Sequence, residues 1–366
     1  MKKFYYVELL RFFSAFSVLI YHYQHFFKPY SSFSTIDISN NKFVQPFYSF
    51  LEIFYNYGNY GVPMFWTISG FVFAFVYLNK QKNISGKKFF INRFSRLYPL
   101  HFATLLIVTL FQIINYKFIG DFQIYERNGL YNFLLHIFFI SGWGFQNGDS
   151  FNAPIWSVSI ELIIYVLFFI SIIYLNKYKI KFILLIYLLF LIIDKSDLCD
   201  YRGESARLWH LFAALNYVLD CGRLFFSGIL VFFIYEKVNK KLYLLLLSVI
   251  LILFSFVGNF KIFLFCPSVL LLFVALEIFI HEKFKKIFEF FGNITYAMYL
   301  LHVPVQILII TIFGHFNIFN DIFISGYFFV FYIMLMTTLS FLCFKFYEKP
   351  LFLKIRSFYS KSNLSK

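Results

Sequence analysis

Residues 4–27 read FYYVELLRFFSAFSVLIYHYQHFF, a run that is long enough to cross a bilayer as one helix. Two of its side chains, Arg11 and His22, are costly in lipid. An arginine inside a membrane helix costs about 2.5–3.5 kcal/mol, so Arg11 must face a polar interior. Eleven positions separate the two residues. This spacing predicts one shared helix face and a separation of roughly 16 Å along the axis.

The composition of the chain indicates a membrane protein. It is 60% hydrophobic, 25% aromatic and 14% charged, whereas soluble domains carry about 25% charged residues. The net charge of +15 does not predict a nucleic-acid partner, because the basic residues punctuate apolar runs and form no patch. The four cysteines (Cys199, Cys221, Cys266 and Cys343) contain no CxxC pair, so no metal site or disulfide framework is expected. Cys221, Cys266 and Cys343 lie within or at the ends of apolar runs and are expected to be packing residues.

The apolar runs predict an all-α membrane protein, a polytopic bundle of about ten transmembrane helices. They are 4–27, 59–79, 97–116, 154–175, 180–194, 211–235, 241–258, 262–281, 292–313 and 322–345. A further apolar piece at 130–141 is too short to span and is expected to be a re-entrant or interfacial helix. The stretch 142–155 is rich in Gly and Asn and predicts irregular backbone.

The distribution of Lys and Arg predicts which loops face the cytoplasm. An even number of spans places both termini on one side, and most loop Lys and Arg residues fall on that side, six of them within 80–96. We therefore expect both termini to be cytoplasmic, in a multi-pass protein of the inner or plasma membrane. Residues 1–350 form the predicted transmembrane domain and 351–366 a short basic tail. The N-terminus lacks a small-residue cleavage site, so we expect 4–27 to be retained.

Arg93 and Arg96 are three residues apart at the start of the third span, which places both guanidinium groups on one helix face. Two adjacent guanidinium groups suit a phosphate-bearing donor, because each binds phosphate oxygens in bidentate fashion. The alternative is ordinary flanking charge at a cytoplasmic helix end.

Glu161 lies about two turns inside the fourth span, which opens with Trp156 and Ser157. A carboxylate at this depth must be paired or face a cavity. It can orient an imidazole or neutralise an arginine. The alternative is a structural ion pair with Arg11 or Arg223.

Further polar residues are candidates for lining a cavity. Ser69 and Gly70 in the second span favour close helix packing, and Ser69 is also a candidate for the cavity wall. Tyr296, Tyr299 and His302 recur every three residues and form a polar strip on one helix side. His302 is either a hydrogen-bonded structural histidine or part of the cavity.

Other polar residues are expected to have structural roles. Asp220 and Arg223, at i and i+3, are expected to pair with each other. His101, His136, His210, His281 and His315 show no partner pattern in the sequence. No phosphate-binding loop, dinucleotide fingerprint or nucleophile elbow is present.

Taken together, the motifs resemble acyltransferase family 3, a family of integral-membrane O-acyltransferases. The residues that carry the resemblance are Arg11 with His22, Phe65 to Gly70, Arg93 to Arg96, Trp156 to Glu161 and Tyr296 to His302. They follow the order of the family and cover residues 8 to about 350. The resemblance implies a ten-helix enzyme that takes an acyl group, by default acetyl, from cytoplasmic acyl-CoA. The implied acceptor is a hydroxyl on an envelope carbohydrate or glycolipid.

The resemblance also implies a role for single residues. The catalytic histidine of the family falls on His22, its first-helix arginine on Arg11 and its glutamate on Glu161, while Arg93 and Arg96 match its arginine pair. We expect His22 to act as general base on the acceptor hydroxyl, with transient acylation of the histidine as the second possibility.

Two rival functions remain open on the sequence. A transporter or flippase for a glycan or a lipid-linked precursor would also line its path with costly polar residues, although the two repeated halves typical of many transporters are not visible. A different membrane acyltransferase family with a central Asn/His pair is disfavoured by the spacing of Arg11 and His22.

Overall fold

The computed structural model describes residues 3–27, 42–78, 85–174, 185, 187–189, 206–316 and 321–362. These residues form helices and connecting turns, with no strand among them. The helices are α1 (Tyr5–Tyr21), α2 (Tyr48–Tyr57), α3 (Gly61–Phe73), α4 (Gly86–Ile119), α5 (Leu130–Ile137), α6 (Ile155–Tyr174), α8 (Ala206–Lys237), α9 (Lys241–Ser255), α10 (Ile262–Leu276), α11 (Glu282–His315), α12 (Asp321–Ile324), α13 (Gly326–Cys343) and α14 (Lys349–Ser362). The prediction of an all-α membrane bundle is confirmed.

Seven helical segments of the described chain are long and apolar enough to cross a membrane. The first predicted span is divided, because α1 ends at Tyr21 and a 3-10 turn continues from His22 to Phe27. The predicted span 241–258 appears as the shorter α9. Most of 180–194 lies outside the described residues. The total of ten spans and the placement of the termini therefore stay predictions.

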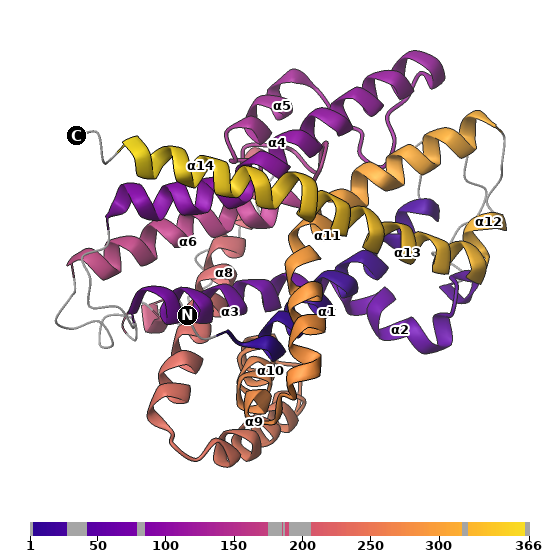
Figure 1. Ribbon diagram of the computed structural model, residues 1–366. Coiled ribbons are helices and arrows are strands. Elements are labelled where there is room, and N and C mark those ends of the chain that lie inside the picture. Colours follow the sequence, from indigo (N-terminus) through magenta and orange to yellow (C-terminus); the bar gives the residue numbers. More distant parts are fainter. Residues whose placement is uncertain are drawn as a thin grey trace.

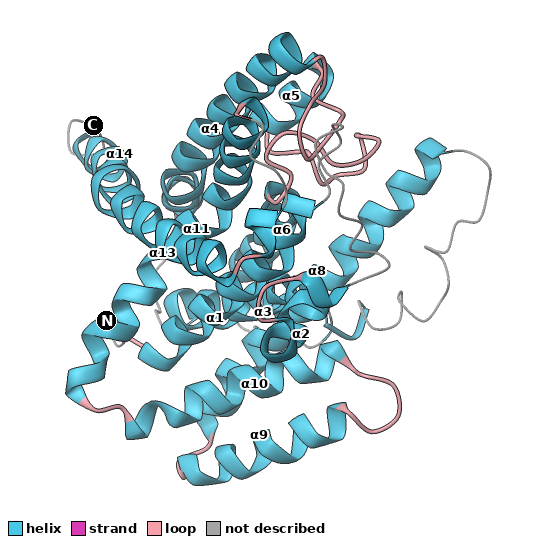
Figure 2. Cartoon of the chain, turned by 90° about the vertical axis from the view of Figure 1, so that its right-hand side faces the viewer, coloured by secondary structure: helices cyan, strands magenta, loops and turns pink. Residues whose placement is uncertain are grey.

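The helices pack around α1, α3 and α11, as Figure 1 shows. α1 lies against α11 and α3, and α3 lies against α8. α9 and α10 pair with each other at one edge of the molecule (bottom of Figure 2), and α4 lies on the opposite side with α5. The interior of this arrangement holds the residues that the sequence singled out.

Glycines allow the closest of these contacts. A Cβ built on Gly70 of α3 would stand 1.8 Å from the carbonyl oxygen of Phe225, and one built on Gly228 of α8 would stand 1.9 Å from that of Thr67. Side chains at either position would force α3 and α8 apart. The predicted packing role of Gly70 is confirmed, and Ser69 beside it is free to face the interior.

One predicted helix start differs from the structure. α4 begins at Gly86 rather than at 97, so Arg93 and Arg96 lie on the same continuous helix as the span. α5 has only eight residues, as expected for a piece too short to span. The stretch 142–154 forms no helix and consists of turns, bends and irregular backbone, as predicted for 142–155, and α6 begins at Ile155.

Candidate active site

Most of the predicted site residues meet at one cavity of about 120 Å³, here called the basic cavity. It lies between α1, α3, α4, α6 and α11. Its polar lining residues are Arg11, Ser69, Arg93, Arg96, Ser157, Glu161, Tyr165, Thr295, Tyr296 and Tyr299. Three arginines and one glutamate thus face the same small space from three separate helices.

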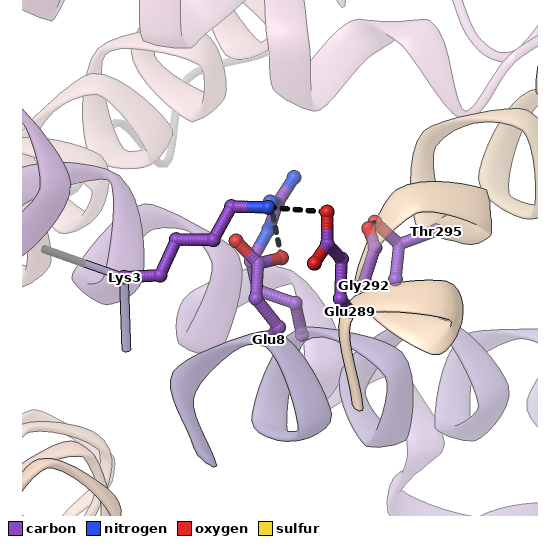
Figure 3. A network of polar contacts seen from close by, with 6 residues as sticks. Lys3, Glu8, Glu289, Gly292 and Thr295 are labelled. Atoms are coloured by element: carbon purple, nitrogen blue, oxygen red, sulfur yellow. Dashed lines mark hydrogen bonds and ion pairs between the residues drawn. The ribbon is translucent and has the colours of Figure 1, made fainter. Parts of the chain in front are cut away.

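Arg11 is held in this cavity by an acidic partner on its own helix. Its Nη1 donates to Glu8 Oε2 at 3.0 Å, and the Arg11 side chain is only 19% exposed. Glu8 in turn lies against Gly292 of α11, beside the ion pair of Lys3 and Glu289 (Figure 3). The partner role of Glu8 was not predicted, although the i, i+3 spacing to Arg11 is a signal for it.

The two arginines of α4 both line the basic cavity, as their spacing predicts. The Arg93 guanidinium lies 4.2 Å from the centroid of the Phe73 ring, a cation–π contact that fixes it against α3. Within the described chain, Arg93 Nε has no hydrogen-bond partner. A partly buried guanidinium with a buried, unused donor can bind an anion.

Glu161 of α6 is 7% exposed, and its Oε1 has no hydrogen-bond partner among the described residues. Ser69 and Tyr165 lie beside the carboxylate, and the charge of Arg93 acts on it. The alternative of an ion pair with Arg11 or Arg223 is wrong. Arg11 pairs with Glu8, and Arg223 pairs with Asp220, which confirms the second pair predicted from spacing.

His22 lines a second cavity of about 290 Å³, here called the histidine cavity. Its Nδ1 lies 3.0 Å from the carbonyl oxygen of Val18. Because a carbonyl can only accept, Nδ1 carries the hydrogen, and Nε2 keeps a lone pair that can take a proton. The turn that follows α1 thus presents His22 as a base.

The two cavities share a wall. Val62, Trp66 and Tyr299 line both of them. The Tyr299 hydroxyl lies 2.8 Å from Ser157 Oγ and also 2.8 Å from the carbonyl oxygen of Pro154, so α11 is joined to α6 at this wall. Arg11 and His22, predicted to share a helix face, therefore line adjoining cavities.

The remaining predicted residues lie around this wall. Trp156 lines the histidine cavity, and its ring packs edge-on against Trp66 at a centroid distance of 5.9 Å. Tyr296 lines the basic cavity and donates to the carbonyl oxygen of Leu97 at 2.6 Å. Ser157 lines the basic cavity as well.

His302 lies behind His22 and lines neither cavity. It is 1% exposed, its ring centroid is 4.9 Å from that of His22, and its Nε2 has no hydrogen-bond partner in the described chain. His25 stands at the same centroid distance from His22 on another side. The described His, Cys, Asp and Glu residues nevertheless form no group that could hold a metal ion.

Sequence reasoning missed a buried link between His101 and His136. His101 Nε2 lies 2.8 Å from the carbonyl oxygen of His136, and His136 Nε2 lies 3.1 Å from Ser150 Oγ. Burial, helped by the nearby His101, lowers the pKa of His136 to about 3. The absence of a partner pattern was misleading here, because the partners are 14 and 35 positions away.

A further acidic residue near the basic cavity, Glu348, was also missed. It ends the π-helical turn Phe344–Glu348 between α13 and α14 and is 8% exposed. Its charge acts on Arg96 and Arg11. Nothing in the sequence indicates this position, because the contact depends on how the last helix returns to α4.

Long apolar helices around two polar cavities define a polytopic membrane protein with an interior site. The family model described as an acyltransferase domain matches residues 4–345, nearly the whole chain. The chain therefore belongs to acyltransferase family 3, as the motifs indicated. Comparison with curated proteins gave no match, and comparison with solved structures gave none either.

Proposed function

We propose that this membrane acyltransferase is an O-acyltransferase, by default an O-acetyltransferase, of the inner or plasma membrane. It moves an acyl group from cytoplasmic acyl-CoA to a hydroxyl of a cell-envelope glycan or glycolipid. The observation that carries the proposal is the shared wall at Tyr299, with arginines in the cavity on one side and His22 in the cavity on the other.

The basic cavity suits the donor. Arg93 and Arg96 supply guanidinium donors for the phosphates of CoA, which are anionic and accept bidentate hydrogen bonds. A space of about 120 Å³ is smaller than typical ligand pockets, so it holds the thioester end while most of the donor lies outside it.

The histidine cavity suits the acceptor. His22 Nε2 takes the proton from the acceptor hydroxyl as its oxygen attacks the thioester carbonyl carbon. The new C–O bond forms, the C–S bond breaks, and the CoA thiolate takes up the proton from the imidazolium. General-base help of this kind contributes about 10²–10⁴-fold. Formation of an acyl-histidine at Nε2 is the second possible route.

Arg11 and Glu161 act as positioning residues in this proposal. Glu8 orients the Arg11 guanidinium, and Glu161 balances the charge of Arg93 close to the wall. Ser69, Ser157 and Tyr296 complete the donor side. Trp156 and His302 support the acceptor side, where the His302 ring packs against His22.

The test is an acyl-transfer assay with purified full-length protein, labelled acetyl-CoA and envelope glycan. The glycan is taken from a strain that lacks this protein. His22→Ala is expected to lose transfer by at least about a hundredfold. Arg93→Ala is expected to lose transfer by about ten- to hundredfold, because a hydrogen bond from a charged group to the donor is lost. His315→Ala and Lys88→Ala are the matched controls, because both residues are exposed and line neither cavity. Full activity in both site variants would overturn the proposal.

A transporter would give a different pattern. Movement of a glycan across vesicles without acylation, together with no saturable binding of acyl-CoA, would contradict the proposed activity. Saturable CoA binding that weakens when the 3′-phosphate is absent would support the enzyme.

A further inference from the structure

The histidine cavity continues into a second hollow that the catalytic proposal does not use. This hollow, of about 350 Å³, is here called the glycine groove and is lined in part by Gly142, Gly144 and Gly148. Asp149, Trp156 and Tyr217 line both the histidine cavity and the glycine groove. These three side chains therefore form the mouth between the two spaces.

The mouth combines aromatic faces with a carboxylate. The rings of Trp156 and Tyr217 are 4.8 Å apart at their centroids, and both residues are accessible. Tyr21, Tyr60 and Tyr125 add further aromatic surface to the histidine cavity. Aromatic rings pack against the C–H faces of sugar rings, and carboxylates accept hydrogen bonds from hydroxyl groups.

The backbone holds Asp149 firmly in this place. Gly148 before it has a φ of +117°, which favours glycine, and Ser150 after it is buried and bonded to His136. The amide of Phe151 donates to Asn128 Oδ1 at 2.6 Å. Asn152 donates to the carbonyl oxygen of Leu300 at 3.0 Å. The carboxylate thus stands directly before a segment, Ser150 to Asn152, that is held by hydrogen bonds.

Within the described chain, no cationic side chain at the mouth balances the charge of Asp149. Among the described residues, no lysine or arginine lines the histidine cavity or the glycine groove. Asp149 forms no ion pair with any described residue, although Arg127 Nη1 lies 3.3 Å from the position of a Cβ built on Gly148. Asp220, the second acid in the histidine cavity, is paired with Arg223.

We propose that the acceptor sugar enters the histidine cavity past Asp149, Trp156 and Tyr217, and that Asp149 selects sugars without an acidic group. The neighbouring units of the glycan lie in the glycine groove. A uronic or sialic acid unit would bring its carboxylate next to that of Asp149, and no lysine or arginine of the described chain lines either space to separate the two charges. This inference rests on the proposed acyl transfer, because it treats the bound sugar as the acyl acceptor. It adds which class of sugar the site accepts.

The test measures binding, so it does not depend on transfer. Full-length protein in nanodiscs of uncharged lipid is titrated with oligogalacturonate and oligoglucuronate trimers and with their carboxyl-reduced forms. We expect the reduced form of at least one pair to bind about tenfold more tightly at low salt, and the difference to shrink in 1 M salt. Equal binding within each pair, tighter binding of the acid, or no binding of any trimer at millimolar concentration overturns the inference.

Asp149→Asn locates the selectivity. The variant keeps the shape of the side chain and is expected to raise affinity for the acidic trimers about tenfold, with the reduced trimers changed less than about threefold. Asp121→Asn is the matched control, because Asp121 lines neither space and its carboxylate accepts from the amide of Phe122. Unchanged selectivity in Asp149→Asn contradicts the assignment.

The acyl-transfer mechanism and the sugar selectivity of Asp149 can be tested separately. CoA binding is measured in the same nanodiscs and also shows that each variant is folded. If the wild-type protein discriminates between the trimers but neither binds CoA nor transfers an acyl group, the acyltransferase mechanism is contradicted and the sugar-binding site still stands. Intact transfer without discrimination between acidic and reduced trimers would contradict only the role of Asp149.

Discussion

Glu8 of α1 occupies the space that a side chain at position 292 of α11 would need. A Cβ built on Gly292 would stand 2.1 Å from Glu8 Oε2, the oxygen that accepts from Arg11. Figure 3 shows this close approach, with Thr295 one turn further along α11. The absence of a side chain on α11 therefore allows Glu8 to hold an arginine of the basic cavity.

Gly292→Ala is accordingly expected to displace Glu8 and with it Arg11. Overpacking of this kind costs about 1–3 kcal/mol, so the variant should unfold at lower temperature and show a higher KM for acyl-CoA. Thermal unfolding and initial rates measure the two effects. Gly129→Ala is the matched control, because nothing lies within 4 Å of its built Cβ. If Gly292→Ala has the stability and the KM of the wild type, Glu8 can move to make room for the added methyl group, and the expected displacement of Arg11 is contradicted.

Tyr299→Phe tests the wall between the cavities. The change removes a buried hydroxyl that bonds Ser157 and Pro154, while Ser157 Oγ keeps its own bond to the Pro154 carbonyl oxygen at 3.2 Å. Loss of each such hydrogen bond costs about 0.5–1.5 kcal/mol. We expect lower thermal stability and slower transfer. Tyr347→Phe, which removes a more exposed hydroxyl bonded to Pro99, should have the smaller effect. The reverse order would contradict the placement of Tyr299 in the wall.

Arg96→Ala tests which part of the donor the basic cavity recognises. Loss of a hydrogen bond from a charged group costs about 1.5–3 kcal/mol, so CoA affinity should fall about ten- to hundredfold. If Arg96 contacts the 3′-phosphate, the wild-type preference for CoA over dephospho-CoA disappears in the variant. Isothermal titration of both ligands measures this, with Lys88→Ala as the control. A loss of affinity that is equal for both ligands would assign Arg96 to another phosphate.

His136 predicts a pH dependence of stability. Its pKa is about 3 in the folded protein and about 6.5 when unfolded, so below about pH 6.5 the unfolded chain binds the extra proton. The stability contribution is complete above that pH and falls as the pH falls, by about 2 kcal/mol at pH 5. His136→Gln should lose stability less steeply than wild type between pH 7 and pH 5, whereas His315→Gln should match wild type. Equal slopes for His136→Gln and wild type would contradict the buried neutral imidazole.

Local sequence patterns correctly predicted the contacts that form within a single helix. The pairing of Asp220 with Arg223 and the common face of Arg93 and Arg96 follow from i, i+3 geometry. Costly polar residues in apolar runs pointed to the interior, which is why Arg11 and Glu161 could be named together. That Arg11 and Glu161 line one cavity depends on tertiary packing, and in the sequence only the resemblance to the family suggested it.

Other parts of the site depend on contacts between distant segments. Glu348 reaches Arg96 because the last helix returns to α4, and no spacing in the sequence encodes this return. Asp149 lies in an irregular stretch, where neither helix period nor strand alternation places a side chain. Its position depends on His136, which binds Ser150 across 14 residues.

The most direct measurement of the central claim is the effect of His22→Ala on donor affinity and on transfer in the same preparation. His22 lines the cavity beyond the wall from the arginines, so acyl-CoA affinity should change less than about threefold. Loss of the general base should slow transfer by about 10²–10⁴-fold. Transfer at the wild-type rate, or a loss explained entirely by weaker acyl-CoA binding, would contradict the assignment of His22 as the base that acts on the acceptor.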